Sequence, residues 1–223
     1  MSDADSFIEE VTEEVRRDRM FQLLKKYGWI GALGVVLIVG GAGLREYNKA
    51  KAQAAAEELG DKITASMQAP EAAARAEALG VIAAEGAGGA AVVKLLQAAA
   101  LSESGDTEAA VALLNTVATD GGIEIIYRHT AAFKALALQA GSLSVQDRML
   151  QYEALAAAGA PLRLLAEEQM ALIEISEGQP EAAITRLSGL LQDAELTPDL
   201  RERAGQVIVA LGGSLEQGAP AGG

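Results

Sequence analysis

The chain of 223 residues contains no cysteine, one histidine and only eight aromatic residues. The absence of cysteine excludes disulfide bonds, thiol catalysis and zinc–thiolate sites, but it does not identify a cellular compartment. Five of the eight aromatic residues lie within the first 47 positions, so the core of the remaining chain must consist mainly of alanine, leucine, valine and isoleucine. Because alanine and leucine are the strongest helix formers, this composition predicts an all-α fold.

The sequence also lacks the residue clusters that an enzyme needs. His129 is the only histidine, which excludes a catalytic triad with a histidine base and a histidine-based metal site. The glycine-rich sequences at 86–89 and 40–43 do not continue as phosphate-binding loops. Glu167 and Glu168 are adjacent, so we expect them to point to different faces of a helix and to lie in solvent. We therefore expect a protein that is not an enzyme and that holds no cofactor and no metal.

Acidic residues outnumber basic residues by 31 to 18, which gives a net charge of −13. A negative field repels nucleic acid and anionic lipid, and it permits basic or unfolded polypeptides as partners. The charge has a simpler explanation as well, because it keeps an alanine-rich protein in solution. Charge thus argues against a nucleic-acid partner without selecting another one.

One uncharged segment stands out near the start of the chain. Residues 27–44, YGWIGALGVVLIVGGAGL, are just long enough for a helix that crosses hydrocarbon. Tyr27 and Trp29 lie at one end, where aromatic rings favour the lipid–water boundary. We expect a transmembrane helix at 27–44, preceded by an amphipathic leader helix at 1–26. A cleaved signal peptide and a buried core helix are the alternatives, but the many acids before residue 27 are untypical of a signal peptide.

Lysine and arginine counts on the two sides of this segment predict its orientation. Residues 9–28 hold five of them and residues 45–64 hold four, a small excess that places the N-terminus on the cytoplasmic side. The larger C-terminal part would then be exported.

Small residues form a stripe on the same segment. Gly31, Gly34 and Gly41 lie roughly on one helix face, with Ile38 between them. Because small residues let another helix approach closely, this face is a candidate docking surface. The alternative is that it reflects the ordinary glycine content of membrane helices.

A short phrase occurs twice in the rest of the chain, as SGDTEAAVALL at 104–114 and as EGQPEAAITRL at 177–187. Aligned on Gly105 and Gly178, the two occurrences are 73 positions apart. Gly141 lies near the midpoint, and APEAAARAEAL occurs one further step upstream. The resulting steps of 37, 36 and 37 residues predict four units, each made of two helices joined at a glycine turn.

Residues at equivalent places in these units predict how the helices pack. The glycines suit the left-handed turn that ends a helix, the alanines suit a close helix crossing, and the leucines fill the adjoining layer. Asp106, Ser144 with Asp147, and Thr197 are predicted to cap the helices that follow them. The predicted packing residues are Ala98, Gly105, Ala110, Leu114, Gly141, Leu150, Ala171, Gly178, Ala183 and Leu187.

A paired-helix repeat of this length resembles a degenerate tetratricopeptide repeat without its aromatic positions. The layout as a whole, from FIEEVTEEVRRDRMFQLLKKYGWIGAL to the EGQPEAAITRL unit, resembles the YfgM-like family of bacterial inner-membrane tetratricopeptide proteins, ancillary subunits of the SecYEG translocon. The resemblance implies a periplasmic α-solenoid at 45–212, tethered beside SecYEG and working with periplasmic chaperones on unfolded polypeptides. It carries over no catalytic residue, and residues 213–223 are expected to form a disordered tail.

In a stacked solenoid, exposed parts of the first helix of each unit are expected to contact a partner. The candidate partner-binding residues are Lys94, Gln97, Tyr127, Arg128 and Glu167. Two other functions stay open. The same architecture suits an assembly or accessory subunit of another envelope complex, such as respiratory or cytochrome machinery, and a membrane-bound hydrolase is the third hypothesis.

Overall fold

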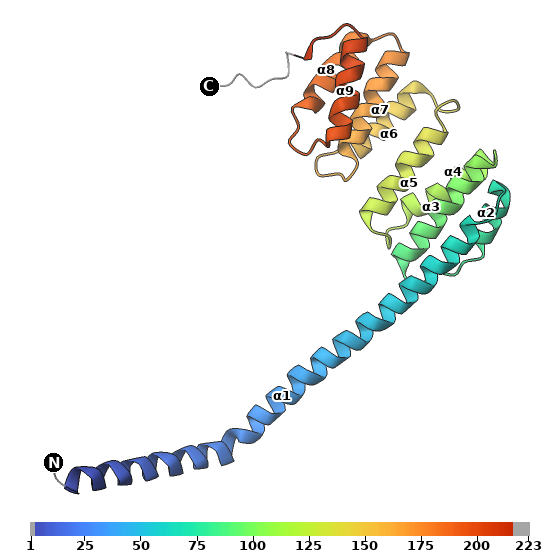
Figure 1. Cartoon of the computed structure of the whole chain (residues 1–223). Coiled ribbons are helices and arrows are strands. Elements are labelled where there is room, and N and C mark those ends of the chain that lie inside the picture. The colour runs from blue at the N-terminus through green and yellow to red at the C-terminus, as the bar shows by residue number, and fades with distance from the viewer. Residues whose placement is uncertain (1–2, 216–223) are drawn as a thin grey trace. The chain divides into compact units, whose positions relative to one another are not determined.

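The computed structural model describes residues 3–215; the side chains of residues 3–16, 18–19, 21–24, 31–32 and 35 lie outside that description. All regular secondary structure in the described part is helical, which confirms the predicted all-α class (Figure 1). The helices are α1 (Asp3–Met67), α2 (Ala72–Gly80), α3 (Ala87–Glu103), α4 (Thr107–Thr119), α5 (Ile125–Leu138), α6 (Val145–Leu155), α7 (Arg163–Ser176), α8 (Pro180–Leu191) and α9 (Pro198–Ala210).

Contacts divide the chain into two units, residues 1–58 and residues 59–223. Over its described part, the first unit consists of α1 alone, and its described side chains are mostly exposed. The second unit contains the last residues of α1, the helices α2–α9 and the hydrophobic core. Most of the predicted tail at 213–223 lies outside the described residues.

The second unit consists of one arrangement of four helices that occurs twice. Each of α2, α3, α4 and α5 reappears 73 residues later, as α6, α7, α8 and α9, with bounds that differ by at most three residues (Figure 1). We refer to residues 72–138 as repeat 1 and to residues 145–211 as repeat 2. The 73-residue spacing seen in the sequence is therefore the spacing of the structural repeat.

The same glycine turns close corresponding helices of the two repeats. Gly105 ends α3 and Gly178 ends α7, with φ angles of 90° and 71°. In both turns the amide after the glycine donates a 2.9 Å hydrogen bond to the carbonyl five residues earlier, the pattern of a left-handed helix cap. Gly86 and Gly159, also 73 residues apart, likewise have positive φ angles, of 81° and 77°.

Two further hydrogen bonds recur at this spacing. Arg128 and Arg201 each donate to a backbone carbonyl ten residues earlier, at 3.4 Å and 2.8 Å. Asp120 and Asp193 each accept a 2.9 Å hydrogen bond from the amide two residues later. The correspondence thus extends from helix bounds to individual atoms.

The predicted caps are confirmed. Asp106 and Thr197 accept hydrogen bonds from the amides three residues ahead, and Ser144 both accepts from the amide of Asp147 and donates to its carboxylate. The paired packing residues are buried, with at most 1% of their surface exposed: Ala98, Ala110, Leu114, Ala171, Ala183 and Leu187. Alanine at these positions lets the helix backbones lie close together, with leucine filling the next layer.

The predicted left-handed turn at Gly141 and the predicted core position of Leu150 are wrong. Gly141 does not have a positive φ, because backbone hydrogen bonds to the carbonyl of Gln139 close this turn instead. As a result α6 begins four residues after its glycine, whereas α4 and α8 begin two residues after theirs. This later start shifts the core position of α6 by two residues. Leu150 is 65% exposed, and Tyr152, 1% exposed, occupies the core position that leucine holds in α4 and α8. Leu79 holds the equivalent place in α2.

Helix α5 joins the cores of the two repeats. Its Ala131 packs with α3 and α4, whereas Leu136 and Phe133 pack with α6 and α7. In α9, the counterpart of α5, the positions of Phe133 and Leu136 hold Gln206 and Val209, both exposed. A more polar outer face is typical of the helix that ends a stack of repeats.

Candidate functional site

The predicted partner-binding residues are only half-exposed, and several have structural roles. The amide nitrogen of Gln97 lies 2.6 Å from the place of a Cβ on Gly80, so Gln97 packs in the contact between α2 and α3. Tyr127 packs against the core of repeat 1, and Arg128 donates to the end of α4. These three positions therefore support the fold.

The other two predicted residues differ from each other. Lys94 has no hydrogen-bond or ion-pair partner among the described residues, whereas Glu167 is bonded to Arg186 at 2.6 Å and lines a groove. No recorded hydrogen bond or ion pair joins any two of the five predicted residues. Of the five predicted partner-binding residues, only Glu167 therefore lines this groove.

This groove lies between α7 and α8 of repeat 2 and has a volume of about 580 Å³. We refer to it as the α7–α8 groove. Its lining is unusual for this alanine-rich chain because charged side chains make up half of it. The lining residues are Arg163, Leu164, Glu167, Glu174, Ala182, Thr185, Arg186, Gly189, Leu190 and Asp193.

Arg186, on α8, binds two carboxylates of α7. Its Nη1 donates to Glu167 at 2.6 Å, while its Nε and Nη2 donate to Oε1 of Glu174 at 3.0 Å and 2.6 Å. The hydrogen bonds to Glu174 and, less strongly, to Glu167 raise the pKa of Arg186 above its ordinary value, against the opposing effect of burial. The guanidinium is therefore charged, and it donates three hydrogen bonds to α7.

Arg163, at the start of α7, is engaged in the same way. It forms ion pairs with Asp193 at 2.8 Å and with Glu195 at 3.0 Å, both beyond the end of α8. The hydrogen bond from Arg163, aided by the backbone amide of Glu195, lowers the pKa of the Asp193 carboxyl below its ordinary value. Both arginines of the groove are thus held by two carboxylates each.

Glu174 retains one unused hydrogen-bond acceptor. The residue is only 8% exposed, and both bonds from Arg186 reach its Oε1. Its Oε2 is buried without a partner. A buried polar atom that lacks a partner is costly, so a group that can donate to Oε2 would be favoured.

Repeat 1 lacks this chemistry at the same backbone positions. Glu174 and Arg186 correspond to Leu101 and Leu113, which pack as partly buried apolar side chains, and Arg163 corresponds to Ala90. Sequence reasoning missed Glu174, Arg186 and Arg163. Aligning the chain on itself at 73 residues would have revealed two leucines replaced by an acid and a base.

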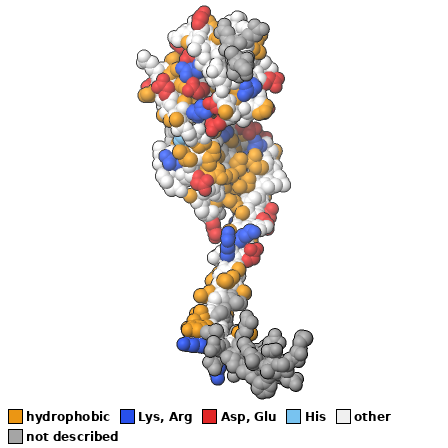
Figure 2. Space-filling model, turned by 90° about the vertical axis from the view of Figure 1, so that its left-hand side faces the viewer, with side chains coloured by type: hydrophobic (Ala, Val, Ile, Leu, Met, Phe, Trp, Pro, Cys, Tyr) orange, Lys and Arg blue, Asp and Glu red, His pale blue; other side chains and the backbone are white. Residues whose placement is uncertain are grey.

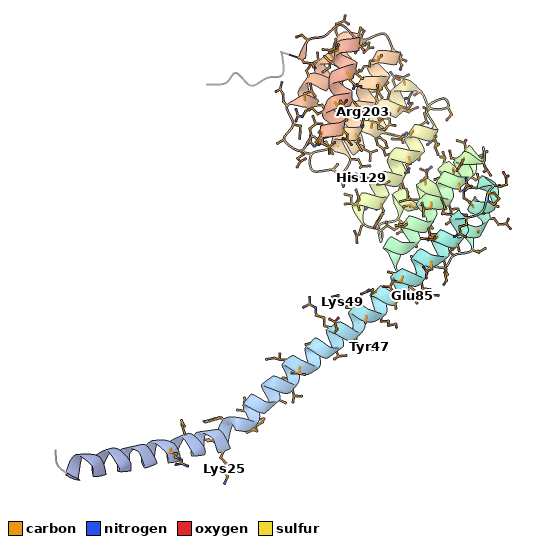
Figure 3. All side chains as sticks on the ribbon, viewed as in Figure 1. Lys25, Tyr47, Lys49, Glu85, His129 and Arg203 are labelled. Carbon is orange, nitrogen blue, oxygen red and sulfur yellow. The ribbon has the colours of Figure 1, made fainter. Side chains whose placement is uncertain are left out.

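The adjacent acids Glu167 and Glu168 do point to different partners, but the expectation that both are solvated is wrong. Glu168 binds Arg203 through two 2.9 Å hydrogen bonds, and its side chain is 13% exposed. Arg203, on α9, is labelled in Figure 3. Glu168 does not line the groove, so only Glu167 of these two adjacent glutamates faces it.

The predicted anchor residues lie in the first unit. Tyr27, Trp29 and Ile38 are exposed, and a Cβ on Gly34 or Gly41 would meet no atom within 4 Å. The side-chain environment of Gly31 lies outside the described residues. Within the described residues, no helix has a stretch long and apolar enough to span a membrane.

Across the described residues, no group of three or more His, Asp or Glu side chains is arranged to hold a metal ion. Comparison of the chain with family models, curated proteins and solved structures finds no match.

Proposed function

We propose that the protein is a membrane-anchored helical-repeat scaffold whose repeats bind polypeptides. The observation that carries the proposal is the surface of α1 between residues 27 and 44, a segment without any charged side chain. Its described large apolar side chains are between 49% and 74% exposed in the isolated helix: Trp29, Ile30, Leu33, Val36, Leu37, Ile38, Val39 and Leu44.

These side chains point to every side of the helix instead of forming one stripe. An apolar stripe fits a single protein partner, whereas an apolar surface all round the helix fits hydrocarbon. Lysines and arginines lie on both sides of the segment, where they can reach the headgroups (Figures 2 and 3). The membrane therefore accounts best for this surface.

The second unit supports the scaffold part of the proposal. Stacked helix pairs offer extended surfaces for polypeptide partners, and the repeat pattern resembles tetratricopeptide repeats. The resemblance to the YfgM-like family favours a place in the bacterial inner membrane, with the N-terminus cytoplasmic and the repeats periplasmic, beside SecYEG and its chaperones. A permanent subunit of another envelope complex is the alternative function.

The test is purification of the full-length protein from bacterial membranes in mild detergent, with mass spectrometry of the proteins that copurify. Translocon subunits together with a periplasmic chaperone are the expected result. A single respiratory or cytochrome complex at fixed stoichiometry would favour the alternative. Release of the protein from membranes by an alkaline carbonate wash would overturn the anchor.

A pair of glycine variants tests whether the small-residue stripe binds a membrane partner. Gly34 belongs to the stripe, Gly40 lies away from it, and both have open space around them. Gly34→Leu should reduce recovery of the membrane partner, because the added side chain keeps a second helix at a distance. Gly40→Leu should leave recovery unchanged, and equal recovery from both variants would remove the stripe from the proposal.

A further inference from the structure

We propose that the α7–α8 groove binds a basic side chain of a polypeptide, with Glu174 as the residue that accepts its ammonium or guanidinium group. The proposal rests on the proposed polypeptide-binding function and names its site and ligand chemistry. Three observations on repeat 2 carry it: the charge around the groove, the unpartnered oxygen of Glu174, and an unexplained glycine.

The charge around the groove selects a cation over an anion. Two arginines, Arg163 and Arg186, are bonded to four carboxylates, those of Glu167, Glu174, Asp193 and Glu195. An anionic ligand would have to compete with two carboxylates for each guanidinium. The excess of negative charge instead attracts an ammonium or guanidinium group.

A basic ligand that turns the Glu174 side chain toward the groove would satisfy the unpartnered oxygen. Oε2 of Glu174 is buried and receives no hydrogen bond from the part of the chain that the structure describes, although Glu174 lines the groove. A donated charge-assisted hydrogen bond would satisfy this oxygen, and such bonds are stronger than neutral ones. In the structure, the three hydrogen bonds of Arg186 end on Oε1 of Glu174 and on Glu167, and none of them reaches Oε2.

Gly189 leaves room for the ligand. It lies inside α8, where glycine costs about 1 kcal/mol relative to alanine. Its φ is not positive, and an added Cβ would meet no atom within 4 Å. Neither the backbone nor packing therefore requires glycine here, and the missing side chain leaves space in the groove that Gly189 lines. The corresponding residue of repeat 1 is Thr116.

The test measures binding of a fluorescein-labelled, lysine-rich peptide to the full-length protein in mild detergent, by fluorescence anisotropy at low salt. The same peptide with glutamate in place of lysine is the control ligand. Glu174→Gln keeps the shape of the side chain but removes its charge. Glu168→Gln is the matched control, because Glu168 lies on the same helix and is paired with an arginine but does not line the groove.

A second pair of variants fills the groove without changing its charges. Gly189→Phe places a ring in the groove, and Thr116→Phe places one at the equivalent position of repeat 1. Thermal melting of all four variants checks that they fold. Because Gly189 has open space around it, Gly189→Phe stays informative if Glu174→Gln is unstable.

We expect the lysine peptide to bind and the glutamate peptide not to bind. Glu174→Gln and Gly189→Phe should each weaken binding at least about tenfold, and the two controls should change it less than about twofold. If the lysine peptide and the glutamate peptide bound equally well, the proposed site would be wrong. It would also be wrong if each variant weakened binding no more than its control.

A competition arm separates polypeptides from free amines. Spermidine that displaces the peptide at equal concentration would assign the groove to small polyamines and overturn the polypeptide ligand. Failure of the groove leaves the copurification result unaffected, so this proposal and the proposed function can fail separately.

Discussion

Repeat 1 and repeat 2 have the same helices and differ in what lies between them. In repeat 1 the contact between its middle helices, α3 and α4, includes Leu101 and Leu113, and in repeat 2 the same positions hold Glu174 and Arg186. The turns, caps and alanine crossings are shared. A few positions therefore specify the backbone of this fold, and the positions between them are free to acquire other chemistry.

The difference has an energetic meaning. A buried ion pair contributes little net stability, because removing two charges from water costs about as much as their attraction returns. Replacing such a pair by apolar residues is often neutral or stabilising by about 1–4 kcal/mol. Stability alone thus does not favour Glu174 and Arg186 over the leucines of repeat 1, which fits a role for them in binding.

The largest expected effect tests the register of the helices in the two repeats. Tyr152→Ala in α6 should cost about 3–5 kcal/mol, and Leu79→Ala in α2 about 2–5 kcal/mol, because both side chains are at most 1% exposed. Leu150→Ala and Glu77→Ala, at the exposed positions two residues earlier, are the matched controls. Chemical denaturation measures all four, and a loss at Leu150 as large as at Tyr152 would contradict the register.

The next effect tests the charged contact of repeat 2. Arg186→Leu alone leaves Glu174 without its main partner and should cost about 3 kcal/mol. The double variant Glu174→Leu with Arg186→Leu copies repeat 1 and should return to within about 1 kcal/mol of the original protein. Urea denaturation of the two variants measures this difference. A double variant as unstable as the single one would show that the repeats are not interchangeable here.

A smaller effect tests the alanine crossings. Ala110→Leu and Ala183→Leu place a larger side chain where each alanine is 0% exposed, and overpacking should cost about 1–3 kcal/mol in each repeat. Thermal melting of the two variants should show similar losses. If the melting temperature of one variant did not change, the helix crossing in that repeat would be packed less tightly than the crossing in the other repeat.

Local signals in the sequence were enough to predict the helices, their caps and the shared packing residues. Proline, aspartate and glycine act on their nearest neighbours in the chain, so Asp106 and Gly178 could be interpreted without a structure. The unit around Gly141 could not, because a single glycine does not determine which type of turn the chain forms. The actual turn depends on hydrogen bonds to Gln139, and it shifts the core position from Leu150 to Tyr152.

The groove was beyond sequence reasoning for a different reason. Its ion pairs join residues 12 and 19 positions apart on two helices, so they depend on how α7 packs against α8. The sequence predicts Glu167 as a partner-binding residue on a first helix, and Glu167 does line the groove. Its partner Arg186 lies on a second helix, where no partner-binding residue was expected.

The smallest expected effect compares two glycine turns, the left-handed turn at Gly178 and the different turn at Gly141. Gly178 has a φ of 71°, so Gly178→Ala should cost about 1 kcal/mol through backbone strain. Gly141 lacks a positive φ, and a Cβ there would meet no atom within 4 Å, so Gly141→Ala should be neutral or stabilise the protein by about 0.5 kcal/mol. Denaturation curves of the two variants measure the difference. A cost at Gly141 equal to that at Gly178 would contradict the turn closed by the carbonyl of Gln139 and would indicate a left-handed turn at Gly141 as well.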